Sequence, residues 1–404
     1  MKHVGIIAEY NPFHNGHQYQ FIKIKEQFPD KKIIVLMSGD YVQRGEPAVF
    51  NKYLRAQCAL RCGADIVLEL PSRSATASAE YFASAGVSAL YKTGLVDTLC
   101  FGAEHDDLPA FCSIAAVLLE EPDSYRNTLQ EQLRHGISYP KARSAAVCSC
   151  LKDENISQLL KQPNNILAIE YVKAVKRHNI PITPHIIKRS GSGYHDLSTD
   201  IPFCSASAIR QLLTESGADI QQHIPKEAYS LLSDSPYAKP LFLSDFYIFL
   251  QYILWEKDSY EDYAEMTKEL SNRLAQITLY PAQIQDLIEE LSGKHITGTR
   301  VRRALLNILL NRKSSETDLD MHEVSYLRLL GFRQSAEPLL KEMKNTCRLP
   351  VINKVADAGK ILSASAYKQF QADIKNSQLY HQAFYNKYAI SMPSEYEHSV
   401  IIEK

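Results

Sequence analysis

The sequence has no long apolar run and no excess of charge of either sign. No apolar segment among its 404 residues approaches the length that a bilayer span requires, and the first three residues lead into a strand pattern instead of a secretory leader. The net charge of −1 gives no global sign of a polyanionic partner, so any contact with nucleic acid has to be regional. We expect a cytoplasmic protein with no membrane partner.

Cysteine is also sparse. Among the eight cysteines only Cys148 and Cys150 lie close together, and no pair spacing is repeated. A disulfide framework or a structural zinc site would need such pairs, so we expect reduced thiols and no structural metal. A hydrophobic content of 45% and a charged content of 23% are those of an ordinary globular protein, and the length suits about two or three domains.

The most informative stretch is HVGIIAEYNPFHNGH, residues 3–17. Residues 4–8 form a short apolar run that fits a buried strand, and the Asn-Pro pair that follows is typical of a turn. A helical pattern begins directly after this turn, so His14 and His17 fall at the N-terminal end of the helix. Their spacing of three residues predicts both imidazoles on one side of the first turn.

This arrangement suits a phosphate group. A helix N-terminus offers unpaired backbone N–H groups and the positive end of the helix dipole, and Gly16 leaves room for a ligand to approach the backbone. Two imidazoles there can stabilise charge that develops on a phosphorus under attack, although nothing supplies a nucleophile. We predict positioning and electrostatic stabilisation of phosphoryl or nucleotidyl transfer. The alternative is that the histidines only cap the helix or satisfy the turn.

Strand and helix patterns alternate through the first part of the chain. Right-handed crossovers between such strands build a parallel sheet, so the predicted fold class is α/β. The predicted strands span residues 4–8, 32–38, 64–70, 97–101 and 182–187, and the predicted helices between them span 51–62, 78–92 and 166–176.

The chain is expected to divide near residue 235. We assign residues 1–235 to a catalytic, ATP-binding domain with a helical insertion at about 109–160. Beyond residue 236 the strand signal fades and amphipathic helical patterns follow, so residues 236–404 are predicted to form a mostly α-helical domain that is a candidate for binding RNA. Those helical patterns cover 242–255, 263–279, 281–291 and 298–311.

Polar residues follow several of the predicted strands, where open parallel sheets bind ligands. Asp40 or Arg44 could act in the loop after the second strand, and a solvated connection is the alternative. Gly102 could let the backbone approach a nucleotide, or could serve a plain turn. Asn164 is placed to cap a helix, or to contact a ligand through its amide.

A second phosphate-binding region is predicted after residue 187. Lys188 and Arg189 lead into a loop with Gly191 and Gly193, which suits a phosphate clamp better than a merely solvated loop. The hydroxyl groups near the next helix start can cap that helix or meet a phosphate. The hydroxyl residues are Ser205 and Ser207.

Residues 294–313 carry six cations and no carboxylate. A run of charge is often only solvated, but a basic helix beside an ATP-type site is a candidate for contact with an RNA backbone. The six cations are Lys294, Arg300, Arg302, Arg303, Arg312 and Lys313.

The His-x-Gly-His element resembles the signature of the HIGH-type nucleotidyltransferase superfamily, which includes the class I aminoacyl-tRNA synthetases. Taken together with SGDYVQRGEP at 38–47, FGAE at 101–104, PNNILA at 163–168 and the Lys188-Arg189 pair, the sequence is similar over essentially its whole length to the bacterial tRNA(Met) cytidine acetate ligase family. The resemblance implies a Rossmann-like parallel sheet of the HIGH nucleotidyltransferase type.

The resemblance also implies an activity. An enzyme of this family activates free acetate with ATP as acetyladenylate, releases pyrophosphate, and acetylates N4 of the wobble cytidine in elongator tRNA(Met) with release of AMP. Mg²⁺ is expected because ATP is a substrate, although no carboxylate cluster marks a protein site for it. No protein partner is implied.

Site residues follow partly from the same resemblance and partly from the residue patterns described above. His14 and His17 would stabilise the transition state at the α-phosphorus, and Asp40 could help to place acetate, the amine or Mg²⁺. Arg189, Ser205 and Ser207 are candidates for binding pyrophosphate, and Lys294, Arg300, Arg302 and Arg303 for binding tRNA. The implied ATP-binding residues are Ile7, Ala8, Glu9, Tyr10, Asn11, Pro12, Phe13, His14, Asn15, Gly16, His17, Gly102, Asn164, Arg189, Ser205 and Ser207.

Two rival functions use the same residues. A nucleotidyltransferase acting on a small phosphorylated metabolite would use the same histidines but would make a stable nucleotide product. An RNA-binding or assembly factor could use the nucleotide site only as a switch, and would then bind ATP without releasing pyrophosphate.

Overall fold

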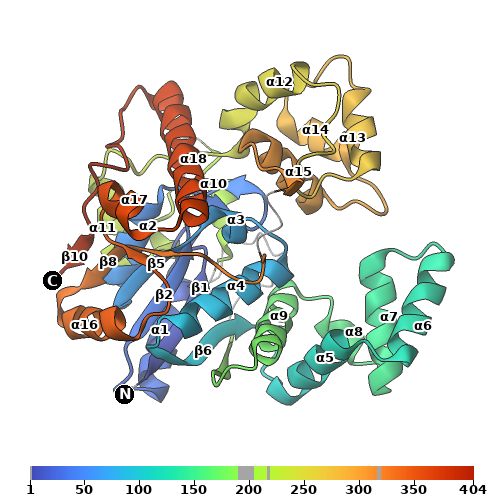
Figure 1. The fold of residues 1–404 in the computed structure, drawn as a ribbon, viewed down its shortest axis with the longest axis horizontal. Coiled ribbons are helices and arrows are strands. Elements are labelled where there is room, and N and C mark those ends of the chain that lie inside the picture. The colour runs from blue at the N-terminus through green and yellow to red at the C-terminus, as the bar shows by residue number, and fades with distance from the viewer. Residues whose placement is uncertain (1, 190–203, 216–218, 316–319) are drawn as a thin grey trace.

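The protein is described as a computed structural model that covers residues 2–189, 204–215, 219–315 and 320–404 (Figure 1). Its centre is an eight-stranded sheet in the order β10-β8-β5-β2-β1-β6-β7, with β9 paired to β8 off that path. The strands of the sheet are β1 (His3–Ala8), β2 (Ile33–Ser38), β5 (Ile66–Leu70), β6 (Val96–Ala103), β7 (Thr183–Lys188), β8 (Leu327–Arg333), β9 (Val351–Ile352) and β10 (Ile401–Glu403).

The strand β1 lies in the middle of this sheet and runs parallel to β2 and β6. The side chains of β1 alternate between two apolar cores: Ile7 belongs to one core, and Val4 and Ile6 belong to the other. A parallel sheet buried on both faces requires such continuous apolar strands, which explains why the sequence reveals them so clearly. The predicted parallel α/β fold is confirmed.

Helices cover both faces of the sheet. On one face α4 packs so closely that a Cβ at Gly86 would lie 2.7 Å from Cδ1 of Ile7 in β1. The helices of the sheet layers are α1 (Asn15–Gln27), α2 (Lys52–Arg61), α3 (Ser72–Ala75), α4 (Ala79–Lys92), α9 (Pro163–His178), α10 (Ala206–Leu212) and α11 (Lys226–Asp234), with a short 3₁₀ turn η1 (Gln221–His223).

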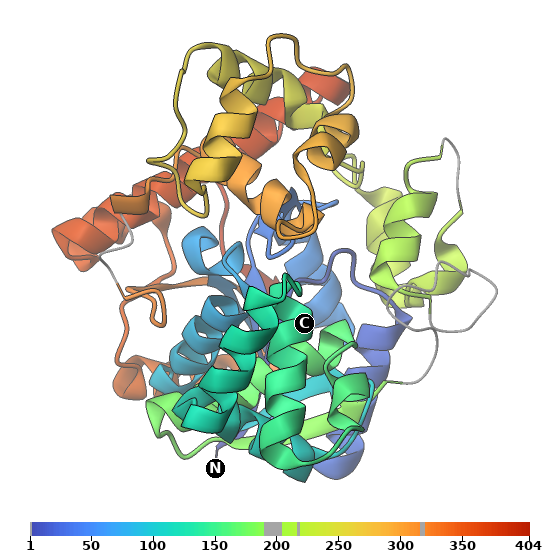
Figure 2. The same ribbon diagram turned by 90° about the vertical axis from the view of Figure 1, so that its right-hand side faces the viewer.

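Two helical groups project from the sheet on the same side, and Figure 2 shows them one above the other. We call the first group the insertion: α5 (Leu108–Glu120), α6 (Asp123–Arg134), α7 (Tyr139–Leu151) and α8 (Ile156–Leu159). We call the second group the helical module, and it has an apolar core of its own. It consists of α12 (Tyr247–Trp255), α13 (Lys268–Ala275), α14 (Ile284–Leu291) and α15 (Gly298–Leu309).

After the helical module the chain returns to the sheet, a feature that the predicted mostly α-helical domain at 236–404 did not include. Strand β8 pairs antiparallel with β5, and β10 then pairs with β8. The returning segment also contains α16 (Glu337–Thr346), α17 (Ala358–Ile361) and the long α18 (Ala364–Tyr388). The apolar run of β8 is interrupted by Gly331 and short enough to suit either a strand or a helix, so its pattern alone did not separate the two.

A buried ionic cluster joins this returning segment to the sheet. The Lys52 ammonium lies 3.0 Å from Glu69, 3.1 Å from Glu395 and 3.6 Å from Asp40. Arg328 of β8 pairs with Glu69 and Glu395. Buried charges are tolerated only when they are paired in this way, so the cluster fixes how the end of the chain sits on the sheet.

One small hairpin connects the sheet to the helical module. It is formed by β3 (Tyr41–Val42) and β4 (Glu46–Pro47), and its Gly45 has φ of +79°. A Cβ there would lie 2.4 Å from the backbone nitrogen of Arg303 in α15, so only glycine allows this approach. Among the described residues, no helix combines the length and the apolar character that a membrane span requires.

Candidate active site

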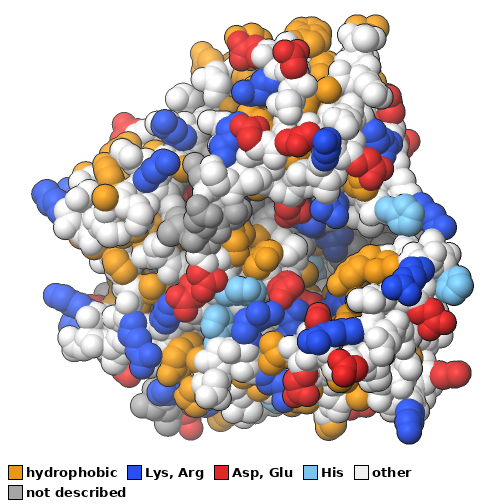
Figure 3. All heavy atoms as spheres, turned by 45° about the vertical axis from the view of Figure 1, so that its right-hand side comes forward, with side chains coloured by type: hydrophobic (Ala, Val, Ile, Leu, Met, Phe, Trp, Pro, Cys, Tyr) orange, Lys and Arg blue, Asp and Glu red, His pale blue; other side chains and the backbone are white. Residues whose placement is uncertain are grey.

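A cavity of about 220 Å³ opens where β1 ends and α1 begins. Its wall also includes residues from the ends of β6 and β7 and from the starts of α9 and α10. In Figure 3 histidine, lysine and arginine side chains gather around a hollow between the two projecting helical groups. The predicted residues that line the cavity are Ile7, Ala8, Glu9, Tyr10, Asn11, His14, Gly16, His17, Gly102, Asn164, Arg189, Ser205 and Ser207.

The two histidines form a hydrogen-bonded cap on α1. Nδ1 of His14 accepts the N–H of Gly16 at 3.0 Å, and Nδ1 of His17 accepts the N–H of His14 at 3.2 Å. Their ring centroids lie 3.9 Å apart. The pair therefore closes the helix start and also faces the cavity, so the capping alternative and the ligand-binding prediction describe the same residues.

These bonds determine what the rings can donate. Because each Nδ1 accepts a hydrogen bond, a neutral ring carries its proton on Nε2, which leaves an N–H donor for a ligand. Burial, with the charges of Arg189, Arg210 and His223, lowers the pKa of His14 to about 3. Burial and the neighbouring His14 also lower the pKa of His17 well below its ordinary value. Both rings are neutral near pH 7.

Gly16 is required by the histidine itself. A Cβ at this position would lie 2.8 Å from Cε1 and 3.0 Å from Nδ1 of His14. Any side chain would push the imidazole out of its capping position. The sequence predicts that Gly16 leaves room for a ligand. In the structure this glycine also leaves room for the His14 ring.

Two aromatic side chains pack against the His17 ring. Tyr10 and Phe13 contact the His17 ring at centroid distances of 4.8 and 5.4 Å, and both are almost completely buried. Tyr10 adopts φ of +49°, an uncommon conformation for a bulky residue that is found where the surrounding structure enforces it. Pro12, Phe13 and Asn15 do not line the cavity; the Asn15 amide donates to the carbonyl of Gln222 instead.

Arg55 holds the strand ends beneath the cavity. Its guanidinium is 1% exposed and donates to the carbonyl oxygens of Glu9, Ser38 and Gly39, beyond or at the ends of β1 and β2. A fixed fork of five donors is well suited to several carbonyl groups at once. Arg55 therefore sets the position of the loop that carries the histidines.

The α10 side of the cavity contributes a cation that the sequence analysis did not select. Arg210 lines the cavity and donates to the carbonyl of Asn11 at 2.7 Å and to Oγ of Ser207 at 3.2 Å. Ser205 caps α10, because its Oγ accepts the N–H of Ala208 at 3.1 Å. The three-residue spacing of Ser207 and Arg210 on a helix was the signal that could have indicated their contact.

On the opposite side a reciprocal clamp orders the start of α9. The Glu104 carboxylate accepts the amide of Asn164 at 2.6 Å and the backbone N–H of Asn165 at 2.8 Å. Asn165 in turn accepts the backbone N–H groups of Glu104 and His105. The helix cap residue is Gln162, so the predicted capping role of Asn164 is wrong, and Asn164 instead lines the cavity.

The remaining walls are aromatic and cationic. Phe101 and Tyr171 lie 5.4 Å apart and, together with Phe82, provide an apolar surface that a purine or an acyl group could cover. A Cβ at Gly102 would make only an ordinary contact with the Arg189 side chain, at 3.4 Å, so packing inside the protein does not by itself require the glycine. The lining cations are Arg44, Lys188, Arg189 and Arg210. The predicted Gly191 and Gly193 lie outside the described residues.

The structure does not bring Asp40 to the cavity. Its carboxylate accepts the backbone N–H of Lys52 at 3.0 Å and the hydroxyl of Ser377 at 2.8 Å, inside the buried ionic cluster. Among the described residues that line the cavity, Glu9 is the only one with a carboxylate. Its Oε1 accepts the N–H of Gln43 at 2.9 Å.

The cations of the basic segment have different surroundings. Arg302 pairs with Glu46 of the β3–β4 hairpin at 3.4 Å, and Arg303 pairs with Glu265 at 2.8 Å. Lys313 pairs with Asp262, and Arg312 donates to hydroxyl groups of α3 and the residue after it. Lys294 is exposed and Arg300 is half-buried. Arg302 thus helps to join the helical module to the hairpin, and the ion pair of Arg303 lies within the module.

The sequence matches a known protein family and several of its members. A family model described as HIGH Nucleotidyl Transferase matches residues 1–394. The chain is 34% identical to the tRNA(Met) cytidine acetate ligase of Acetivibrio thermocellus over the full length of both. It is 37% identical to the protein of that name from a Thermoanaerobacter species, over 95% of this chain and 96% of the relative.

Two solved structures share the fold of this chain over its whole length. The crystal structure of Thermotoga maritima TmcAL without ligand is 29% identical in sequence, with a TM-score of 0.94 and complete coverage of both chains. The same Thermotoga protein bound with alpha-thio ATP matches with a TM-score of 0.91 and the same identity and coverage.

Proposed function

We infer that this chain, which belongs to the tRNA(Met) cytidine acetate ligase family within the HIGH nucleotidyltransferases, activates acetate with ATP and transfers the acetyl group to N4 of the wobble cytidine of elongator tRNA(Met). The observation that carries this proposal is the pair of neutral, hydrogen-bonded histidines in a cavity lined by cations. A related protein of the same fold has been solved with an ATP analogue bound.

The first half-reaction needs no nucleophile from the protein. A carboxylate oxygen of acetate attacks the α-phosphorus of ATP, the bond to the bridging oxygen breaks, and pyrophosphate leaves with that electron pair. The Nε2–H groups of His14 and His17 would donate to the oxygens on which charge develops. Neutral imidazole donors need no proton transfer during the step, in the same way as the neutral histidine of triosephosphate isomerase, a known example of this behaviour.

The cavity divides into a phosphate side and a nucleoside side. Arg189 and Arg210, with the hydroxyl of Ser207, would bind the triphosphate and the departing pyrophosphate, because fixed guanidinium forks match phosphate oxygens. Gly102 and Asn164 would contact the nucleoside against the aromatic wall of Phe101 and Tyr171.

Mg²⁺ would enter with ATP. In the described part of the chain no three His, Cys, Asp or Glu residues are grouped to hold a metal ion. Mg²⁺ commonly keeps several water ligands and binds through substrate phosphates, so its protein contacts would be few. Bound there, it would neutralise phosphate charge.

The second half-reaction requires a proton acceptor. The N4 amine of cytidine attacks the acetyl carbonyl carbon, the bond from that carbon to the AMP oxygen breaks, and the nitrogen must lose one proton. We assign this proton to Glu9, because it is the only carboxylate among the described residues that line the cavity. Its Oε1 accepts a hydrogen bond from Gln43, which would orient the carboxylate. Because ATP and tRNA are cytoplasmic substrates, we place the protein in the cytoplasm.

The proposal is tested by transfer of labelled acetate to elongator tRNA(Met) in the presence of ATP and Mg²⁺, with AMP and pyrophosphate followed in parallel. The matched control is the same transcript with uridine at the wobble position, which has no N4 amine. Label in the cytidine transcript alone, with equal AMP and pyrophosphate, is expected. Pyrophosphate release that depends on a small phosphorylated metabolite and leaves the tRNA unlabelled would overturn the proposal.

A further inference from the structure

Two segments of the chain contain basic residues and no carboxylate. The first covers residues 132–152, from the end of α6 through α7 of the insertion, and the second covers 292–315, which includes all of α15 in the helical module. They are separated by about 140 residues of sequence that carry many acidic side chains. Their common composition would have no consequence if they lay on opposite faces of the molecule.

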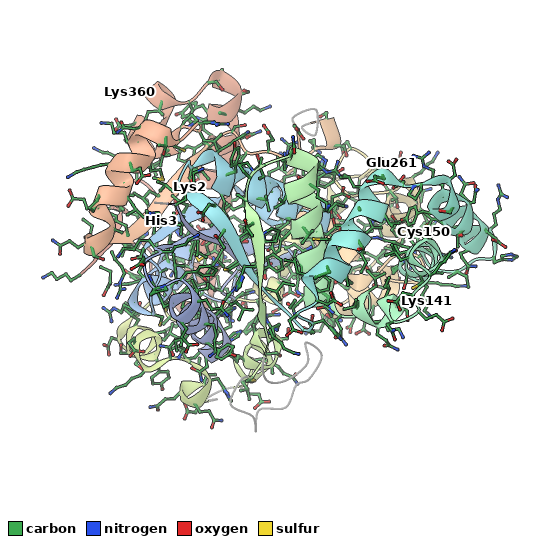
Figure 4. The ribbon with its side chains drawn as sticks, turned by 90° about the horizontal axis from the view of Figure 1, so that it is seen from below. Lys2, His3, Lys141, Cys150, Glu261 and Lys360 are labelled. Carbon is green, nitrogen blue, oxygen red and sulfur yellow. The ribbon has the colours of Figure 1, made fainter. Side chains whose placement is uncertain are left out.

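The fold brings the two segments together. Gly136, with φ of +69°, ends the turn after α6, and a Cβ built on it would lie 3.9 Å from Nζ of Lys294. The Lys294 side chain of the helical module therefore reaches the α6–α7 turn of the insertion, on the side of the molecule where both groups project in front of the sheet (Figure 2). Figure 4 shows Lys141 on the periphery of the insertion, away from the sheet.

The cations at this junction are available to a ligand. Arg134, Lys141 and Lys294 are exposed, and none of them makes an ion pair with any described residue. This distinguishes them from Arg302 and Arg303, whose charges are neutralised by Glu46 and Glu265. His135 and His295 are exposed beside them, Arg300 is half-buried, and the Tyr139 ring is 56% exposed. We call the six residues Arg134, His135, Lys141, Lys294, His295 and Arg300 the cationic rim.

The elements that carry the rim contact or lead into walls of the cavity, and the six rim residues themselves do not line it. The backbone of α15 at Arg303 contacts Gly45, and the two residues before Gly45 in the hairpin, Gln43 and Arg44, line the cavity. On the insertion side α8 leads directly into α9, whose Asn164 lines the opposite wall. A polymer whose reactive base enters the cavity would thus pass the rim with the neighbouring part of its backbone.

Charge and shape favour RNA as the occupant. A protein reads single-stranded RNA loops by stacking bases on aromatic side chains and by binding phosphates with cations, and the rim together with the exposed Tyr139 offers both. We propose that the cationic rim binds the phosphate backbone of the tRNA substrate beside the base that enters the cavity. This proposal rests on the proposed function and extends our predicted RNA contact from the helical module to the insertion.

The test compares two triple variants with the same change of charge. The rim variant carries Arg134→Gln, Lys141→Gln and Lys294→Gln, and the control variant carries Lys344→Gln, Lys354→Gln and Lys375→Gln, at exposed positions of the returning segment. The dissociation constant for elongator tRNA(Met) is measured by fluorescence anisotropy at several salt concentrations. We expect the rim variant to bind on the order of tenfold more weakly and to lower the slope of log K against log salt by about two to three.

The outcomes separate this proposal from the proposed function. Equally weakened tRNA binding in both triple variants, or unchanged binding in both, would overturn the proposed role of the rim. The affinity would then depend on net charge or on another surface. Acetate-dependent pyrophosphate exchange in the unaltered protein without tRNA tests the proposed function independently. If that exchange is absent while the rim variant alone loses tRNA affinity, the proposed function fails and the RNA-binding rim stands. Absence of tRNA binding by the unaltered protein would overturn both.

Discussion

His14 and His17 each use one ring nitrogen to bond the backbone of the first turn of α1, and this leaves one N–H donor per ring in the cavity. A shorter residue that retains the cap but places no donor where Nε2–H lies therefore isolates the contribution of the ring. Asparagine does so, because its side-chain oxygen is among the best acceptors at a helix N-cap.

We predict that His14→Asn lowers the rate of acetyladenylate formation by about 10²- to 10³-fold, the usual cost of one donor to developing charge, with little loss of stability. Acetate-dependent exchange of labelled pyrophosphate into ATP measures the rate, and the melting temperature measures the fold. A rate within a fewfold of that of the unaltered protein would show that the imidazole acts only as a cap.

The low pKa of His14 also predicts an acid-sensitive fold. In the unfolded chain the ring titrates near 6.5 and in the folded protein near 3, so between these values the unfolded state binds more protons. The contribution of His14 to the free energy of unfolding is therefore complete above pH 6.5. It is lost as pH falls toward 3, by up to about 1.4 kcal/mol for each pH unit. Urea unfolding at pH 4.5 to 7, at about half-unit steps, should show a shallower dependence for His14→Asn. Identical slopes would mean that His14 is already charged in the folded protein.

Glu9 is the residue to which we assign the proton of the cytidine amine. Glu9→Gln keeps a similar shape and an acceptor for the Gln43 N–H, but it cannot take a proton, so we expect transfer to slow by about 10²-fold or more. The measurement is single-turnover transfer from enzyme-bound acetyladenylate to tRNA, with Glu9→Asp as the variant expected to recover part of the rate. Transfer by Glu9→Gln at the unaltered rate would remove this assignment.

Only part of the site can be predicted from sequence at this scale. His14, Gly16 and His17 share one turn, so their spacing determines their contact. Arg210 reaches the same cavity from a position almost two hundred residues away, and Asp40 is drawn into an ionic cluster with Glu395. Such contacts depend on tertiary packing, which local spacing does not encode.

At the scale of elements, the buried parallel strands were predictable and the returning strands were not. The strands β1, β2 and β5 read as continuous apolar runs because both of their faces are covered. The helix α18 is 25 residues long, yet its faces contact the sheet layer, the hairpin and the helical module, so its apolar residues do not form one stripe. Its sequence therefore showed no clear period.

The junction between the β3–β4 hairpin and α15 depends on Gly45. We predict that Gly45→Ala destabilises the protein by about 1 kcal/mol or more, because alanine is strained at a positive φ and its Cβ would meet the α15 backbone. Gly136→Ala is the matched control, since it shares the positive φ but its Cβ would make only an ordinary contact, with the Lys294 ammonium at 3.9 Å. Chemical unfolding of both variants separates the two contributions. Equal losses of unfolding free energy in the two variants would show that the close approach of Gly45 to Arg303 adds nothing to the cost of the positive φ.

At the scale of the whole molecule, the end of the chain returns to the sheet that carries the cavity. The last segment adds β8 and β10 to the sheet, and Glu395 neutralises Lys52 and Arg328 in its interior. The insertion and the helical module project on one side and approach each other at Gly136 and Lys294, where the cationic rim forms. The net charge of −1 concealed this surface, because carboxylates elsewhere balance it.

The central claim is that acetate itself attacks the α-phosphorus of ATP in this cavity. The most direct measurement uses acetate labelled with ¹⁸O in both oxygens, elongator tRNA(Met) and ATP, followed by mass spectrometry of the released AMP. Attack by acetate and later cleavage of the bond between the acyl carbon and that oxygen predict one ¹⁸O atom in the phosphate of every AMP formed. AMP without the label, or the release of ADP and phosphate, would contradict the account.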